Sequence, residues 1–205
     1  MLGTLLILVV YYVQLLAIMN PFSVVPTFLN MTQGVDRREV VRIVKRATIA
    51  GLLIVITFTL VGKYILEVFS VSIAGLRVGG GIILLVLAID MLGEGPRTKR
   101  MHSEDIAVVP IATPLIIGPG TITTILLLTA SKPGDVVNVL LVLIAGIAAC
   151  LTSFAVLGAS RLLVRYLRAS VIRALGRFMA LIIAGIAVEM IATGVRMYYH
   201  EMISS

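Results

Sequence analysis

Charged side chains are scarce in this sequence. Of its 205 residues, 13% are Asp, Glu, Lys or Arg, whereas 60% are hydrophobic. A soluble domain typically has about a quarter charged and about half apolar residues. The low charge and raised apolar content indicate that lipid is the solvent of this chain. Because a hydrocarbon span needs about 20 apolar residues, the length allows about six membrane helices and no separate soluble domain.

The sequence has a single cysteine, no tryptophan and none of the common catalytic motifs. Cys150 is the single cysteine and lies in an apolar run, which excludes a disulfide framework. There is no nucleophile-elbow, zinc-protease or phosphate-binding glycine motif, so we expect neither an enzyme nor a bound metal or cofactor. The absence of Trp, beside six Phe and six Tyr, argues against a wide drug pocket lined by aromatic rings.

Six apolar segments are long enough to cross a bilayer. They are Thr4–Met31, Ala47–Leu66, Val71–Gly93, Ile106–Ala130, Val136–Ser160 and Phe178–Met197. The sequence therefore predicts an all-α polytopic membrane protein of the cytoplasmic membrane, with a single membrane domain over residues 1–205.

The basic residues gather on one side of these segments. The loops after the first, third and fifth segments hold 13 of the 17 Lys and Arg residues. A net charge of +7 could indicate a nucleic-acid partner. However, basic residues in short loops between apolar runs are typical of cytoplasmic loops of membrane proteins. We therefore expect these three loops inside, both termini outside, and no nucleic-acid partner.

Two proline pairs occur at matching places in the first and fourth segments. Asn20-Pro21 is followed by Pro26, and Thr113-Pro114 is followed by Pro119, so each pair is spaced by five residues. Chance and the general frequency of proline in membrane helices are the alternative explanation for the match.

A second match lies at the end of each half. Asp90 lies in the third segment within Ala-Ile-Asp-Met-Leu, and Glu189 lies in the sixth within Ala-Val-Glu-Met-Ile. Each half has three passes, so the second half must be inserted upside down relative to the first. The sequence thus predicts two inverted three-helix repeats, residues 1–95 and 106–205. Such repeats with interrupted helices at matching positions point to a secondary transporter.

The prolines are expected to interrupt the first and fourth helices. A proline inside a helix lacks its N–H and clashes with the carbonyl four residues earlier, and unwound backbone survives in a membrane only where protein or a polar cavity covers it. Each restarted helix presents free N–H groups, which suit an anion. The alternative is that the prolines only kink two buried helices. The predicted substrate-binding residues are Asn20, Pro21, Ser23, Thr27, Thr113, Pro114, Gly118, Pro119, Gly120 and Thr121.

Asp90 and Glu189 are the predicted proton-coupling residues. Only short stretches separate them from Arg77 and Arg177, too short to cross a bilayer, so both acids should lie within or near the membrane. Acids at such depth are costly and often carry protons. The alternative is local pairing at the headgroup level, for example of Glu189 with Arg196.

A glycine cluster in the third segment predicts a close helix–helix contact. Gly75 and Gly79 are spaced as G-x-x-x-G and are followed by Gly80 and Gly81. Small residues at this spacing let two membrane helices approach closely.

With these motifs, the sequence resembles the MarC family of membrane proteins, which includes the SnatA-type small neutral amino acid transporters. The resemblance covers the whole chain and rests on its length, its six spans and two motifs. These are Asn20-Pro21-x-x-x-x-Pro26 and Thr113-Pro114-x-x-x-Gly118-Pro119-Gly120-Thr121. The resemblance implies transport of glycine, alanine and similar solutes, driven by an ion gradient, with the substrate site at the two interrupted helices.

The favoured hypothesis is therefore a carrier of small neutral amino acids coupled to protons, with sodium as the second choice of ion. A passive channel, a non-transporting membrane module, and an exporter of drugs or metabolites are the alternatives. The paired breaks and the small residues beside them favour a small-solute carrier over a channel. The direction of flux and the oligomeric state are left open.

The charge asymmetry makes a testable prediction about topology. In a Cys150→Ala background, an Arg97→Cys variant should react with a membrane-impermeant thiol reagent only after the membrane is opened. A Lys132→Cys control should react in intact cells, because Lys132 lies in a loop expected outside. Labelling of the Arg97→Cys variant from outside intact cells would contradict the orientation.

Overall fold

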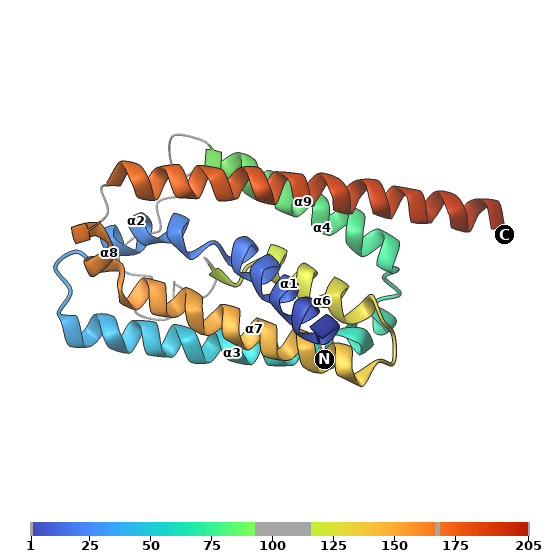
Figure 1. The fold of residues 1–205 in the computed structure, drawn as a ribbon, viewed down its shortest axis with the longest axis horizontal. Helices are drawn as coiled ribbons and strands as arrows, with labels where there is room; N and C mark the ends of the chain where they lie inside the picture. The colour runs from blue at the N-terminus through green and yellow to red at the C-terminus, as the bar shows by residue number, and fades with distance from the viewer. Residues whose placement is uncertain (1, 93–115, 167–168, 205) are drawn as a thin grey trace.

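The computed structural model describes residues 2–92, 116–166 and 169–204, which form helices joined by short turns and loops (Figure 1). Its helices are α1 (Leu2–Met19), α2 (Pro21–Met31), α3 (Arg37–Val68), α4 (Ile73–Leu92), α6 (Pro119–Ala130), α7 (Val136–Gly158), α8 (Ser160–Tyr166) and α9 (Ala169–Ser204).

Five apolar helices are long enough to cross a membrane, and one is shorter. The long ones are Gly3–Met31, which combines α1 and α2, Arg37–Val68, Ile73–Leu92, Val136–Gly158 and Ala174–His200; the shorter one is α6, with 12 residues. Five of the predicted spans are thereby confirmed as apolar helices. The span predicted at Ile106–Ala130 is described only from residue 116, so its first half lies outside the described residues. The chain is an all-α, multi-pass integral membrane protein.

Two helices extend well beyond the predicted apolar spans. The helix α3 begins before Ala47 because Asp36 caps it, and the Asp36 carboxylate accepts a hydrogen bond from the Arg38 N–H at 3.1 Å. A capped first turn with charged side chains is stable in water outside the hydrocarbon. The helix α9 likewise has 36 residues, about 54 Å of helix at 1.5 Å per residue.

The helices form layers around α6. The antiparallel pair α4 and α9 lies along one side of the bundle, α3 and α7 lie along the opposite side, and α1, α2 and α6 lie between them (Figure 1). Of the 12 residues of α6, eight are buried, including four threonines. Two apolar clusters flank this helix, one around Leu15, Val25 and Phe154, the other around Leu84 and Ala187.

The outer faces of the bundle are apolar. Leu6 of α1, Leu53 of α3 and Leu181 of α9 are each at least 60% exposed. Contiguous exposed apolar surface of this kind marks a membrane-facing side, so the structure agrees with the composition of the chain.

The predicted glycine cluster of α4 makes close helix contacts at Gly75, Gly80 and Gly81 but not at Gly79. A Cβ atom placed on Gly81 would lie 2.8 Å from the Ala187 carbonyl oxygen, and one on Gly80 would overlap the Thr123 side chain. Gly79 has nothing within 4 Å of such an atom. The prediction was therefore wrong for Gly79, because a helix turns about 100° per residue and this residue points away from α9.

This contact leads to a stability prediction. Gly81→Leu should lower the free energy of unfolding by about 1–3 kcal/mol, the usual cost of overpacking, because the Ala187 carbonyl belongs to the backbone and cannot move aside. Gly79→Leu is the matched control and should leave stability unchanged. Thermal unfolding of the two purified variants in the same detergent measures the difference. Equal melting temperatures for both variants would contradict the close α4–α9 contact.

Candidate functional site

The first apolar segment is interrupted at a single residue. The helix α1 ends at Met19, Asn20 adopts left-handed backbone angles (φ 38°, ψ 63°), and α2 begins at Pro21. A proline disfavours helical geometry in the residue before it and supplies no N–H. Asparagine is one of the few side chains that tolerate the left-handed region. The sequence Asn20-Pro21 therefore explains the interruption locally.

Asn20 carries an unusual buried amide. The residue is 4% exposed, and its Oδ1 has no hydrogen-bond partner among the described residues. Its Nδ2 makes only a long contact to the sulfur of Met91, at 3.9 Å. An unsatisfied buried acceptor costs about 1–3 kcal/mol. The break therefore contains an oxygen that would accept a hydrogen bond from a bound solute.

Ser23 adds a second unpaired oxygen to the first turn of α2. Its Oγ is buried without a hydrogen-bond partner in the described ranges, and a Cβ placed on Gly176 of α9 would lie 2.7 Å from this oxygen. The predicted residue Thr27 is half-buried one turn further along α2. Asn20 and Ser23 are thus the members of the predicted set that offer free acceptors at the first break.

Pro26 does not interrupt α2. The helix continues through it to Met31, and Pro26 is exposed. The expectation that both prolines of the pair unwind the backbone was wrong for this residue. Pro26 is the sixth residue of α2, so it removes one backbone hydrogen bond, the one to the Phe22 carbonyl, without ending the helix.

A second helix starts inside the bundle at Pro119. Gly118 precedes α6 in extended backbone (φ −90°, ψ −174°), and the Thr121 hydroxyl donates to the Ile116 carbonyl at 3.2 Å. Proline is favoured at the first position of a helix, and the N–H groups of the first turn have no helical partner. The other members of this predicted group, Thr113 and Pro114, lie outside the described residues.

The two helix starts lie in the same part of the bundle. A Cβ placed on Gly120 would lie 3.7 Å from the Ile18 side chain of α1 and 2.5 Å from Leu84 of α4. Ile117 packs in one cluster with Met19 and Val25. Both starts lie near the middle of the bundle along its long axis (Figure 1). Gly120 is therefore a close packing point between three helices as well as a neighbour of the break.

Asp90 and Glu189 do not lie at these helix starts. Both are exposed on the α4–α9 pair, and neither forms an ion pair within the part of the chain that the structure describes. The residue after each acid points inward instead. Met91 contacts Asn20, and Met190 belongs to the apolar cluster around Leu84.

Sequence reasoning missed two neighbours of the first break, Met91 and Gly176. Met91 directly follows Asp90, a predicted proton-coupling residue, and this position was the one sequence feature that could have drawn attention to it. Gly176 is one small residue in a long helix, and no pattern in the sequence distinguished it. Contacts between segments far apart in the chain cannot be derived from spacing within either segment.

Comparison with known proteins places this architecture in a family. Residues 5–199 match the MarC family of integral membrane proteins. A UPF0056 membrane protein of Methanocaldococcus jannaschii is 34% identical over 194 residues, which cover 89% of this chain and 93% of the relative. YvbG of Bacillus subtilis is 31% identical over 90% of this chain and 92% of its own length. YhcE of Escherichia coli is 32% identical, with coverages of 91% and 90%.

No solved structure matches the chain. The sequence relatives extend over nearly its whole length, from the first apolar helix to the last. On this basis, the chain belongs to the MarC family of integral membrane proteins.

Proposed function

We propose that this protein is a secondary transporter of small neutral amino acids such as glycine and alanine. Transport proceeds by alternating access around the two helix starts, and a proton gradient drives it. The observation that carries this proposal is the buried, unpaired amide oxygen of Asn20 at a left-handed break between two apolar helices. Interrupted helices around a mid-membrane site are typical of secondary transporters.

The chemistry at the two helix starts suits a zwitterion. The unpaired oxygens of Asn20 and Ser23 accept hydrogen bonds, which fits an ammonium group. The first turn of α6, at Gly120 and Thr121, presents N–H groups and the positive end of a helix dipole, which fits a carboxylate. The surrounding side chains, such as Ile18, are apolar and closely packed. These features favour a solute with a small side chain over a large drug.

The proposal includes two inverted repeats. Pro21 and Pro119 both open a helix and are 98 residues apart, and Asp90 and Glu189 are 99 residues apart. The agreement supports pairing Pro21 with Pro119, whereas the sequence motif paired Pro21 with Pro114. The antiparallel packing of α4 and α9 also suits a two-fold axis in the membrane plane.

The proposed orientation places the basic end of the bundle in the cytoplasm. The start of α3 and the helix α8, which carries Arg161 and Arg165, lie at one end, and both termini lie at the other (Figure 1). This segregation supports termini outside.

Purified protein in liposomes tests the function directly. Labelled glycine should accumulate against its gradient when a pH gradient is imposed, and a sodium gradient alone should have no effect. Accumulation driven by a sodium gradient alone would show that sodium, and not the proton, is the coupling ion. Downhill glycine flux that is independent of both the pH gradient and the sodium gradient would instead indicate a channel. The absence of any glycine flux would refute the proposal.

Asn20→Gly separates binding from folding. Glycine adopts the left-handed conformation without cost, so the break should persist, and removal of an unpaired oxygen should leave the melting temperature equal or higher. Glycine affinity should fall about tenfold or more, the cost of one hydrogen bond to a charged group. Asn30→Ala, an exposed position on α2, is the control. Unchanged glycine binding in the Asn20→Gly variant would place the site elsewhere.

The coupling residues form a separate prediction. Glu189→Gln should abolish accumulation driven by a pH gradient yet retain glycine exchange at equal concentrations, because the amide cannot carry a proton. Asp90→Asn should have a milder effect. Uphill transport that survives in the double variant would show that neither acid carries the proton.

A further inference from the structure

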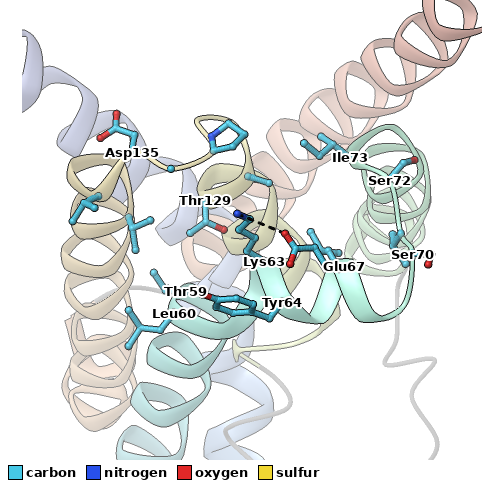
Figure 2. A pocket seen from close by; sticks show the side chains of 17 residues that line it. Thr59, Leu60, Lys63, Tyr64, Glu67, Ser70, Ser72, Ile73, Thr129 and Asp135 are labelled. Carbon is cyan, nitrogen blue, oxygen red and sulfur yellow. Dashed lines mark ion pairs between the residues drawn. The ribbon is translucent and has the colours of Figure 1, made fainter.

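A cavity lies at the end of the bundle opposite α8. It has a volume of about 590 Å³ and is formed by the end of α3, the end of α6 and the start of α7 (Figure 2). Thr129, on its inner wall, is ten residues along α6 from Pro119, about 15 Å at 1.5 Å per residue. The cavity is therefore separate from the two helix starts.

The cavity is a wedge between α3 and α7. Further along the bundle these helices pack closely, since a Cβ placed on Gly146 would lie 2.7 Å from the Val55 side chain. Toward the end of α3, Leu60 of α3 and Val139 of α7 line the cavity. The walls are largely apolar, as for a hydrocarbon chain.

Three charged residues line the cavity, Lys63, Glu67 and Asp135, and the Asp135 carboxylate already accepts a hydrogen bond from the Asn138 N–H at the start of α7. The Lys63 ammonium is 3.6 Å from the Glu67 carboxylate, and the two side chains are 62% and 58% exposed (Figure 2). Glu67 lies in the last turn of α3, where the helix dipole disfavours a carboxylate. Lysine four residues before glutamate is also the weaker order for such a pair. Glu67 is therefore suited to a further cation.

The rim also contains a backbone conformation that side chains rarely adopt. Ser70, which lines the cavity, has a φ of 52°, a left-handed geometry usually occupied by glycine after a helix. Its side chain lies across the turn from Lys63 and Glu67 (Figure 2), so Ser70 shapes the edge of the cavity and is not part of the charged pair.

We propose that this cavity binds one phospholipid with a zwitterionic ammonium–phosphate headgroup, from the leaflet at this end of the bundle. The phosphate contacts Lys63, the ammonium contacts Glu67, and an acyl chain lies between Leu60 and Val139. A cavity of this size falls in the range of roughly 300–1,000 Å³ that takes drug-sized ligands. Glycine would leave most of it empty, so a free amino acid is the disfavoured occupant.

The rim, and not the apolar wall, must give the selectivity. Lipid tails are as apolar as leucine side chains, so transfer of a tail from bilayer to wedge gains little. The headgroup contacts therefore distinguish a bound phospholipid from the surrounding lipid. A lipid that lacks the ammonium should bind less well.

Native mass spectrometry of the full-length protein in detergent tests the site, with phosphatidylethanolamine as the probe and phosphatidylglycerol as the comparison. Glu67→Gln and Lys63→Gln should each reduce retained phosphatidylethanolamine about tenfold, the loss of one charge-assisted contact. Lys132→Gln, which removes a lysine outside the cavity lining, should not. Val139→Trp should fill the wedge and also prevent binding, whereas Val137→Trp, at an exposed neighbour, should not.

Two results would overturn the proposal. If both lipids are retained equally, and retention is unchanged in the Glu67→Gln and Val139→Trp variants, the bound lipid is only unspecific surrounding lipid. Displacement of phosphatidylethanolamine by free glycine, dependent on Lys63, would make the cavity an amino acid site. Melting temperatures of the variants confirm folding, and the side chains of Lys63, Glu67, Lys132 and Val137 are exposed. Glycine transport in liposomes is measured in parallel, so failure of this site is distinguishable from failure of the proposed transport.

Discussion

Backbone hydrogen bonding within the membrane is the constraint on which this structure depends. Hydrocarbon offers no partner for an N–H or a carbonyl, so apolar segments must be helical or be covered by protein where they are not. The chain meets this requirement with helices over all but a few of its described residues. Both exceptions inside the bundle, Asn20 and Gly118, occur directly before a proline. Neighbouring helices cover both positions, with Met91 beside Asn20 and Ile18 beside the start of α6.

The buried position of α6 follows from the same constraint. A short helix that starts inside the bundle cannot expose its first turn to lipid, so the other helices must surround it. Two of its threonines satisfy their hydroxyls on the helix itself, Thr124 on Gly120 and Thr129 on Ile125. The N–H groups of its first turn have no helical partner and border the proposed solute site. The unpaired oxygens lie at the other helix start, on Asn20 and Ser23 at the beginning of α2.

The two sites proposed here differ in ways that match their surroundings. The helix starts are closely packed, and no charged side chain is among the buried residues that the structure describes, which suits a small solute that must be released again. The wedge between α3 and α7 is large and opens at the surface, and Lys63, Glu67 and Asp135 are the charged residues that line it. Such a wedge suits a molecule that already resides in the membrane. The same two helices pack closely further along the bundle, at Val55 and Gly146.

The sequence by itself determined the features that depend on one segment at a time. Apolar runs of membrane length, basic residues confined to alternate loops, and the interruption at Asn20-Pro21 all follow from local composition or from the missing proline N–H. Only the tertiary structure decided which groups meet. It left the Asn20 oxygen unpaired, turned Gly79 away from α9 and Gly81 toward it, and placed Asp90 and Glu189 on exposed faces. Spacing along one helix specifies the relative directions of its side chains, but the neighbour in each direction is set by packing between segments far apart in the chain.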